Sequence, residues 1–536
     1  METQKLIVGI DLGTTFSCCH FFNQQSGNFE CWKFDTGYSI PSVVNFTSHP
    51  VVVGIPDQNA VTEVKRLIGL KYNDPEVQNL MNKDVFPYEI VEGLNGDVAI
   101  QIYTQKSGHE ENLKPEFISA TFLRAINKQL RNKFNLTDQD EICAIISVPA
   151  FFTIPQKDAT MAAARMSRFT LLGMISEPQC ALKAYGLEKH KPGYYLAFDL
   201  GGGTFDLTIM KKDAEGNRIS TVFTGGDPHL GGLDFDSNFL QYVVNKIYDD
   251  NEEYGKKFKI SGKDIPKVKT AKKKLLYRLR KIVENAKIQL SSKTEVYIDI
   301  SHLVDEEPET ATYELTRKEF EECNMHLFQR TIELTLQGIQ KVHINRSLIR
   351  EILLVGGSSR IPIISTMLRE HFPPEVVINN QIDPNVIVSL GAAQYARDKV
   401  MTGVVDVKEV VAYPISVRNY ESNNSTYTLY NIIEVGTQIP METVQFGFFV
   451  DQVEAYIELE ENGRDLGTFT INNIPQSARN TVQYFDISLG IDGTLSVRGN
   501  IDGRPFECQK SIQRRTEQRR SQVSASMELV EEYVEQ

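Results

Sequence analysis

Two short segments of the chain repeat one pattern of residues that could bind phosphate. LIVGIDLGTTFS surrounds Asp11, and YYLAFDLGGGTFD surrounds Asp199, 188 residues later (199 − 11). In each segment an apolar run ends in Asp-Leu-Gly, and glycine and threonine follow. Glycine allows a tight turn that approaches a ligand closely, and consecutive backbone N–H groups in such a turn bind anions.

The aspartate at the end of each run suggests a cation beside the phosphates. A carboxylate cannot itself bind phosphate, but it can hold water on Mg²⁺ or orient an attacking water. One such turn alone would be an ordinary hairpin, whereas two in the same context argue against that interpretation. The pair therefore predicts a duplicated fold that closes on one nucleotide. The different G-x-x-x-x-G-K-[ST] phosphate loop is absent from the sequence.

The elements that would position these turns alternate over residues 1 to about 400. Strand-like runs at 7–10, 144–148, 195–198 and 352–355 are short and bounded by glycine, proline or polar turns. A helix-like segment follows Lys114, with Pro115 in its first turn and apolar side chains along one face. This alternation predicts an α/β architecture with partly parallel sheets.

The sequence changes character after about residue 403. Alternating apolar runs, separated by the turns Asn462-Gly463, Asp492-Gly493 and Asp502-Gly503, predict an all-β domain, a β-sandwich or something near it. The joint at 403–416 has an apolar centre at 410–412, which is unusual for a passive linker. It is either a first edge strand or a linker that docks on the first domain in one state.

Composition narrows the class of protein. The chain has 536 residues, which predicts at least two domains, and 41% apolar and 24% charged residues, typical of a soluble globular protein. No run approaches the length of a membrane helix, and the N-terminus is not a secretory signal. A net charge of −13 argues against nucleic acid as a partner. Seven cysteines without a C-x-x-C pair indicate reduced thiols in a cytosolic protein and no zinc site.

Five further segments complete a family pattern. They are VKRLIG with Lys65, VPAFF with Pro149, SEPQCALKAYG with Glu177, GDPHLGGLDFD with Gly231, and LLVGGSSRIP with Gly357. In this order and spacing they resemble the ATPase domain of the 70-kDa heat-shock protein chaperones over about residues 5–400. The resemblance continues more weakly through VGTQIP, LGTFTINNIP and FDISLGIDGTLSV, which are similar to that family's peptide-binding β-sandwich. Actin and sugar kinases share the Asp-Leu-Gly turns but lack the whole set.

The resemblance implies a domain organisation. An actin-like two-lobed α/β ATPase domain would span 1–402, a linker 403–412, an all-β sandwich that binds peptide 413–513, and a short basic and helical tail 514–536. The tail segment SMELVEEYVEQ resembles only the beginning of the family's helical lid. We therefore expect a lidless or truncated member of the family, with weak and fast-exchanging peptide binding.

The resemblance also implies the roles of individual residues. The catalytic set would be Lys65, Glu177, Asp11, Asp199 and Thr204, with Lys65 as the main catalytic cation and Glu177 acting with Pro149 to couple phosphate state to domain docking. The water shell of Mg²⁺ and flanking K⁺ ions would be held by Asp11, Asp199 and Asp206. The remaining nucleotide contacts would be Gly13, Thr14, Thr15, Phe16, Gly202, Gly203, Gly231, Glu284, Lys287, Ser291, Gly357, Ser358 and Arg360.

Each of these roles has a simpler alternative. Without its motif Lys65 would be a solvated surface lysine, and Glu177 a carboxylate at a helix N-terminus. The basic segment 267–290 could be a nucleic-acid patch, but apolar residues interleave at helical spacing, so we expect a solvated helix.

Several positions depart from the family pattern. Ile288 stands where the family usually has an arginine stacked on adenine, and Leu233, Pro228 and Asn385 also differ. Lys157 stands where an arginine usually communicates with the linker, and the linker sequence VVAYPIS resembles that of larger relatives that act as exchange partners. The changes at Ile288, Leu233, Pro228 and Asn385 predict weaker ATP affinity rather than loss of hydrolysis.

The leading prediction is an ATP-dependent molecular chaperone in the cytoplasm, with ATP or ADP, Mg²⁺ and K⁺ as ligands. Its partners would be unfolded or nascent polypeptides, a J-domain co-chaperone and a nucleotide-exchange factor, with neither nucleic acid nor membrane. Extended polypeptide would lie along a strand edge. The alternative is a lidless regulatory co-chaperone, an exchange factor or ribosome-associated relative that binds ATP with little turnover. A sugar kinase would leave the β domain unexplained.

Overall fold

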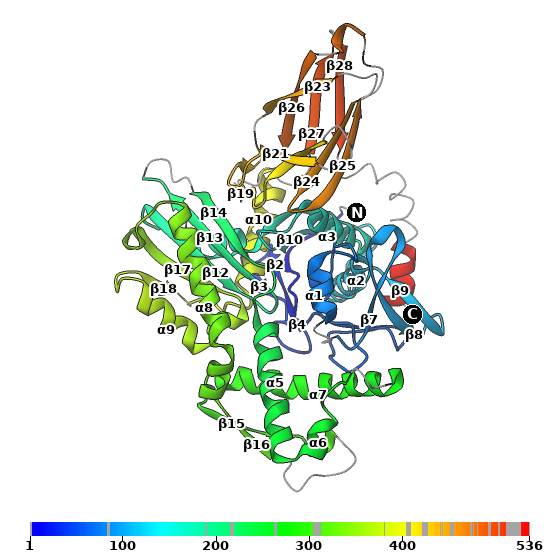
Figure 1. Ribbon diagram of the computed structural model, residues 1–536, viewed down its shortest axis with the longest axis vertical. Helices are drawn as coiled ribbons and strands as arrows, with labels where there is room; N and C mark the ends of the chain where they lie inside the picture. Colours follow the sequence, from blue (N-terminus) through cyan, green and yellow to red (C-terminus); the bar gives the residue numbers. More distant parts are fainter. Residues whose placement is uncertain are drawn as a thin grey trace.

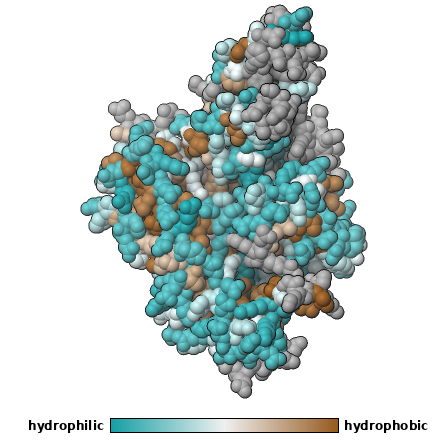
Figure 2. Space-filling view, in the orientation of Figure 1, coloured by the Kyte–Doolittle hydropathy of each residue, from teal (hydrophilic) through white to brown (hydrophobic). Residues whose placement is uncertain are grey.

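The structure is a computed structural model of the chain (Figure 1). It describes residues 3–82, 86–187, 190–214, 219–261, 265–303, 312–379, 381–403, 409–420, 427–439, 441, 443–450, 455–471, 474, 476–479, 481–490, 495–501, 504–510 and 527–534. In the described part of the chain, no helix combines the length and apolar character needed to cross a membrane. The face seen in Figure 2 is largely hydrophilic.

The first lobe is built on a mixed sheet with the order β11-β10-β1-β2-β3. These strands are β1 (Lys5–Asp11), β2 (Phe16–Asn23), β3 (Asn28–Cys31), β10 (Glu141–Val148) and β11 (Thr170–Ser176). β1 forms an antiparallel hairpin with β2 and pairs in parallel with β10 on its other side. The predicted runs 7–10 and 144–148 are therefore neighbouring parallel strands.

The second lobe repeats this arrangement in the sheet β14-β13-β12-β17-β18. Its strands are β12 (Gly193–Leu200), β13 (Phe205–Lys212), β14 (Ile219–Asp227), β17 (Ile349–Val355) and β18 (Val377–Asn379). β12 forms an antiparallel hairpin with β13 and pairs in parallel with β17. Asp11 and Asp199 thus occupy equivalent places next to the hairpin turns, as the sequence repeat predicted.

Helices cover both sheets and join the lobes. α2 (Pro115–Phe134) begins at Pro115 as predicted and buries Phe117, Phe122 and Leu130 in the core of the first lobe. A separate core fills the second lobe. α10 (Ile387–Thr402) packs against β1, β10 and α4 (Glu177–Tyr185), so one helix near the end of the two-lobed region holds the base of the first lobe.

The remaining elements extend the two lobes. The first lobe adds β4 (Ile40–Pro41), β5 (Val44–Asn45), β6 (Val52–Val53), η1 (Val64–Arg66), α1 (Pro75–Asn82), β7 (Glu89–Glu92), η2 (Leu94–Gly96), β8 (Val98–Thr104), β9 (His109–Leu113) and α3 (Ile154–Met166). The second adds α5 (Gly232–Asp250), α6 (Glu252–Lys256), α7 (Pro266–Leu290), β15 (Glu295–Asp299), η4 (Ser301–Leu303), β16 (Thr312–Thr316), α8 (Arg317–Lys341), η5 (Arg346–Leu348), η6 (Gly357–Arg360) and α9 (Pro362–His371).

The C-terminal region holds two four-stranded antiparallel sheets. One has the order β21-β20-β24-β25 and contains β20 (Ile415–Tyr420), β21 (Tyr427–Ile433), β24 (Ala455–Glu461) and β25 (Arg464–Ile471). The other has the order β23-β26-β27-β28 and contains β23 (Val444–Val450), β26 (Thr481–Leu489), β27 (Leu495–Ile501) and β28 (Arg504–Lys510). Apolar side chains from both sheets, including Ile457 and Phe485, form one core. A short 3-10 helix, η7 (Gln476–Ala478), precedes β26.

Turn chemistry accounts for one of the predicted hairpins. Asn462 and Gly463 both have positive φ, 50° and 76°, at the turn between β24 and β25. Such a turn favours Asn-Gly because few other residues accept positive φ at both positions. The turns predicted at Asp492-Gly493 and Asp502-Gly503 lie outside the described residues.

The segment that joins the two regions makes strand contacts. β19 (Glu409–Val410) pairs with β22 (Gln438–Ile439), as the edge-strand interpretation predicted, and it also lies against β14 of the second lobe. Val410 and Val411 are buried. Part of this joint, residues 404–408, lies outside the described residues.

A short helix at residues 527–534 packs on the first lobe, far along the chain from its neighbours (Figure 1, red). Tyr533 is only 2% exposed, and its ring lies 5.5 Å from that of Phe46 and 5.7 Å from that of Phe117. The basic stretch before this helix lies outside the described residues. None of the six described cysteines forms a disulfide.

Candidate functional site

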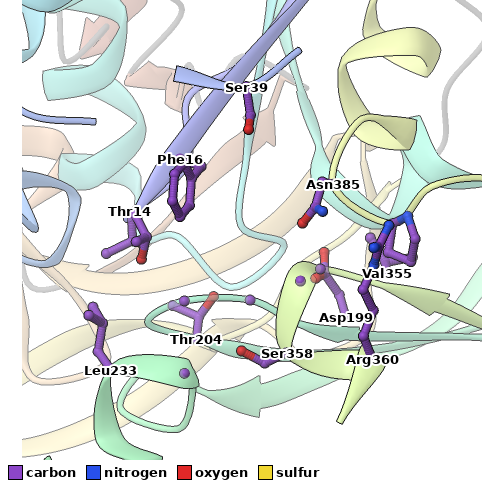
Figure 3. A pocket seen from close by; sticks show the side chains of 18 of the residues that line it. Thr14, Phe16, Ser39, Asp199, Thr204, Leu233, Val355, Ser358, Arg360 and Asn385 are labelled. Carbon is purple, nitrogen blue, oxygen red and sulfur yellow. The ribbon is translucent and has the colours of Figure 1, made fainter. Parts of the chain in front are cut away.

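A cavity of about 640 Å³ lies where the two lobes meet, and both Asp-Leu-Gly turns line it. Figure 3 shows Thr14 and Phe16 facing Thr204, Ser358 and Leu233 across this space. The predicted site residues that line the cavity are Asp11, Gly13, Thr14, Thr15, Phe16, Lys65, Glu177, Asp199, Gly202, Thr204, Glu284, Lys287, Ser291, Gly357, Ser358 and Arg360.

Three predicted site residues lie behind the cavity wall rather than in it. Asp206 is fully buried and accepts a hydrogen bond from the backbone N–H of Ala150, 3.0 Å away. A Cβ on Gly231 would lie 2.8 Å from the backbone of Gly202, so Gly231 supports the second turn from below. Gly203 packs against Thr14 and Arg66. These residues therefore support the wall of the cavity.

The two turns approach each other closely. A Cβ on Gly202 would lie 2.0 Å from Oγ1 of Thr15, so a larger residue there would collide with the first turn. The N-terminus of α5 braces the second turn, because Gly232 and Leu233 donate their N–H groups to the carbonyls of Gly201 and Gly202 at 3.0 and 2.7 Å. Oγ1 of Thr15 is buried with no protein hydrogen-bond partner, which leaves its hydroxyl available for a ligand.

The floor of the cavity concentrates negative charge. Asp11, Asp199, Asp206 and Glu177 are largely buried around a single ammonium, that of Lys65, whose Nζ lies 2.5 Å from Oε1 of Glu177. Burial and the charge of Glu177 raise the pKa of Asp11 to about 7 and raise the pKa values of Asp199 and Asp206. Burial lowers the pKa of Lys65, but Glu177 and Asp11 outweigh it, so its pKa is raised and it stays protonated.

This donor set fits a hydrated divalent cation. Oδ2 of Asp206 is buried without a protein hydrogen-bond partner, and the carboxylates outnumber the cation beside them. Mg²⁺ is bound by oxygen ligands and keeps several waters. Among the described residues, no three His, Cys, Asp or Glu side chains are arranged to ligate a metal directly. Contact through water and phosphate oxygens is the mode that these residues fit.

α7 forms the wall opposite the turns. Glu284, Lys287, Ile288 and Ser291 all line the cavity from this helix. Nζ of Lys287 lies 2.8 Å from Oδ2 of Asp236 in α5, which fixes one end of that wall. Ile288 is 54% exposed and faces the open side of the cavity. Of the other departures from the family pattern, Leu233 and Asn385 line the cavity and Pro228 does not.

Several lining residues were not predicted. They are Ser39, Gly201, Gly232, Asp236, Ser292, Val355, Gly356, Ile361, Pro384 and Val388. The sequence could have pointed to Asp236. It is the second aspartate of the GGLDFD segment that already contributed Gly231, and a carboxylate buried beside a cavity needs a cationic partner. Ser39 lies outside every motif, and only the fold brings it to the cavity.

One segment joins this cavity to the β region. Ala150 contacts Asp206, as described above, and Nζ of Lys65 lies 5.8 Å from the ring centre of Phe152. At the other end, the backbone N–H of Ile154 donates to Oε2 of Glu461 at the end of β24, 2.8 Å away. Residues 149–154 therefore touch the acidic cluster on one side and the β region on the other.

Comparison with known proteins agrees with this geometry. The family model described as Hsp70 protein matches residues 7–536. The chain is also similar to "Chaperone protein DnaK" of Carsonella ruddii (strain PV), with 30% identity over 518 residues, which cover 92% of this chain and 80% of that protein. The chain therefore belongs to the Hsp70 family. It is an ATP-dependent molecular chaperone and an ATPase, a class that binds ATP or ADP, generally with Mg²⁺, and unfolded polypeptides.

Proposed function

We propose that the cavity between the lobes is the ATPase site and that Lys65, Glu177, Asp11, Asp199 and Thr204 perform its chemistry. The observation that carries this proposal is the buried Lys65–Glu177 pair set between two facing Asp-Leu-Gly turns. Phosphoryl transfer depends mainly on positioning and on charge stabilisation, so a fixed ammonium between two phosphate-binding turns suits it.

Each part of the site has a task in this proposal. The turns 13–15 and 202–204 hold the phosphates through backbone N–H and threonine hydroxyl groups. Asp11, Asp199 and Asp206 hold the water shell of Mg²⁺ and flanking K⁺. Bound Mg²⁺ neutralises charge on the phosphate oxygens. Lys65 stabilises charge on the terminal phosphate and orients the attacking water, while Glu177 holds the Lys65 ammonium in place.

The adenosine would lie between α7 and η6. Glu284, Lys287 and Ser291 on α7 would contact the sugar and base, while Gly357, Ser358 and Arg360 approach from the other side. Phe16 would close the cavity near the first turn, and Gly203 and Gly231 would act from behind the wall.

The β region supports a peptide-binding role. The shared apolar core of its two sheets favours a β-sandwich at 413–513 that binds extended polypeptide, with 403–412 as the linker after an ATPase domain at 1–402. A J-domain protein and a nucleotide-exchange factor would be the co-chaperones. The cytoplasm would be the protein's location.

The segment 149–154 would transmit the state of the phosphates. Its contacts with Asp206 and Lys65 would respond to the terminal phosphate, and its bond to Glu461 would pass that response to the β region. Glu177 and Pro149 would act at the start of this segment. Coupling of this kind requires that ATP favour one of two domain arrangements.

Substitution of Lys65 tests the proposed site. We expect Lys65→Ala to lower the single-turnover hydrolysis rate by at least about 100-fold, because one charge-stabilising group is lost, while ATP affinity changes little. Calorimetry and a quenched single-turnover assay measure the two quantities. Lys71→Ala is the matched control, since Lys71 is half-exposed and pairs with Asp97 outside the cavity.

Two results would contradict the proposal. Hydrolysis at the wild-type rate in Lys65→Ala would remove Lys65 from the catalytic set. No single-turnover hydrolysis in the wild type itself would favour the regulatory co-chaperone that binds ATP with little turnover.

A further inference from the structure

The residue beside Lys65 points away from the cavity. Arg66 follows Lys65 in the short 3-10 helix η1, so the two side chains diverge. The side chain of Arg66 is only 4% exposed, and the residue does not line the cavity. Its Nη2 lies 2.8 Å from Oδ2 of Asp234 and donates to the carbonyl of Gly203 at 3.3 Å. Both acceptors belong to the second lobe, whereas Arg66 belongs to the first.

The acceptors of Arg66 sit where the second phosphate turn is held. Asp234 lies in the first turn of α5, and the same Oδ2 accepts the backbone N–H of Gly231 at 3.1 Å. A Cβ on Gly203 would lie 3.2 Å from Nε of Arg66, so the guanidinium packs directly on the turn. One guanidinium therefore contacts both the turn and the helix end that braces it.

A second ion pair crosses the cleft beside the first. Oε1 of Glu63 lies 3.1 Å from Nη1 of Arg280 in α7, and Oε2 of Glu63 lies 3.5 Å from Nη1 of Arg66. Nη2 of Arg280 donates to the carbonyl of Leu233 at 3.4 Å, at the start of α5. All four charged side chains are buried, and their two positive and two negative charges balance. We call Glu63, Arg66, Asp234 and Arg280 the interlobe charge cluster.

We propose that the interlobe charge cluster holds the lobes closed and that Arg66 is a positioning residue, which fixes Lys65 and the Gly202–Gly203 turn at a set separation. This inference rests on the proposed roles of Lys65 and the turns. Opening the cleft would break the Arg66–Asp234 and Glu63–Arg280 pairs, whereas Glu63 and Arg66 would stay together on the first lobe. Removing one partner from the closed cluster by substitution would leave a buried charge uncompensated, which is strongly unfavourable. Arg66 acts through its neighbours and touches no reacting atom.

The cluster explains features that phosphate binding alone does not. Gly203 lies behind the cavity wall, where its missing side chain makes room for the guanidinium. Glu63 adopts a left-handed backbone with φ 59°, which is uncommon outside glycine and turns its carboxylate towards Arg280. Asp234 accepts hydrogen bonds from both lobes at one oxygen atom.

Arg66→Met, Arg66→Lys and Asp234→Asn in the full chain test the proposal. We expect Arg66→Met to lower the single-turnover hydrolysis rate at least about tenfold while ATP affinity changes by less than about threefold, because the phosphate turns themselves remain. Arg66→Lys keeps the charge but cannot span both acceptors, so its rate should fall with little change in melting temperature. The double variant Arg66→Met/Asp234→Asn should be no slower than the slower single variant, since the pair acts as a unit.

Glu89→Gln is the control, because the Glu89 side chain is 63% exposed and pairs across the same cleft with Lys273, 3.0 Å away. Its rate should match the wild type. If Arg66→Met also matches Glu89→Gln, or if rate losses in the whole series merely follow melting temperature, the cluster does not position the site. Lys65→Ala separates this failure from failure of the proposed function. If Lys65→Ala is inactive while Arg66→Met is fully active, the proposed ATPase site stands and only the role of the interlobe charge cluster is excluded.

Discussion

The acidic floor of the cavity has a consequence for cation binding. Burial raises the pKa of Asp11 to about 7 and also raises the pKa values of Asp199 and Asp206, so without a cation Asp11 is partly protonated near neutral pH. Lys65 compensates only part of this charge, and its closest contact is with Glu177. A bound cation would displace those protons, which links cation affinity in this site to pH.

Single residues on the side of the cavity proposed to hold the adenine base should determine the affinity for ATP. Ile288 lines the cavity from α7 but offers no charge to a base. An arginine there can stack on adenine, and a cation–π contact contributes about 0.5–2 kcal/mol. We therefore expect Ile288→Arg to tighten ATP binding by about 2- to 30-fold in calorimetry. Ile288→Leu, which keeps an apolar side chain, should bind as the wild type does. Unchanged or weaker binding in Ile288→Arg would exclude this explanation.

Sequence motifs predicted which residues line the site, but not the ion pairs that hold those residues in place. The two Asp-Leu-Gly turns could be recognised because glycine and aspartate in that order serve phosphate and cation binding. Arg66 and Glu63 could not, because their partners lie 168 and 217 residues away (234 − 66 and 280 − 63). Only the fold brings such charges together, and a lone arginine in a sequence indicates a solvated surface.

At the scale of elements, local sequence patterns predicted those strands and helices that bury one face and expose the other. α2 begins at Pro115 because proline suits the first helical turn, and its buried face follows the helical period. The helix at 527–534 was also expected, because its segment resembles the start of the family's helical lid, but its location was not. Its buried face contacts Phe46 and Phe117, and no local signal identifies such distant partners.

The contacts of this helix combine an apolar anchor with charge. The hydroxyl of Tyr533 donates to Oε2 of Glu111 at 2.5 Å, and Nζ of Lys106 lies 4.7 Å from the Tyr533 ring. Glu531 pairs with Arg168, and Glu532 pairs with Lys106. Most of the docking free energy should come from the buried ring, because exposed ion pairs contribute little.

Tyr533→Ala should therefore release the helix while the ATPase lobes stay folded. Loss of a fully buried aromatic side chain costs about 3–5 kcal/mol, which is large against the smaller buried side chain of Val530 and the ion pairs that remain. Amide hydrogen exchange of residues 527–534 should become fast, and exchange within α2 should hardly change. Leu529→Ala is the control, since Leu529 lies on the same helix and is 40% exposed. Protected exchange in Tyr533→Ala would show that Val530 and the ion pairs suffice to hold the helix.

At the scale of the whole molecule, the β24–β25 hairpin connects the β region to the first lobe. Nη2 of Arg464 at this hairpin lies 3.0 Å from Oε2 of Glu76, and Nε of the same side chain lies 3.5 Å from Oδ2 of Asp74. Its neighbour Glu461 accepts the backbone N–H of Ile154 and is almost completely buried. The hairpin thus places the guanidinium of Arg464 beside two partly buried acids and the buried carboxylate of Glu461 at the N-terminus of α3.

Glu461 should make the docking of the β region depend on pH. Burial raises its pKa from 4.5 to about 7, and the opposing effects of the Ile154 N–H, Lys157 and Arg464 are smaller. An acid whose docked pKa exceeds its undocked value takes up a proton on docking, so docking is most stable below the undocked pKa. The docked fraction should fall as pH rises from about 4.5 towards 7 and stay constant above that.

Fluorescence transfer between labels on the first lobe and on β25, measured from pH 6 to 8, tests this expectation. The wild type should lose docked fraction as pH rises to about 7 and change little above that, and Glu461→Gln should remove that dependence because glutamine stays neutral while still accepting the Ile154 N–H. Glu458→Gln, on the same strand but more exposed, should keep the wild-type profile. A pH profile shared by the wild type and Glu461→Gln would assign the effect to another group. A flat wild-type profile would show that Glu461 remains ionised when docked, held by Lys157 and Arg464.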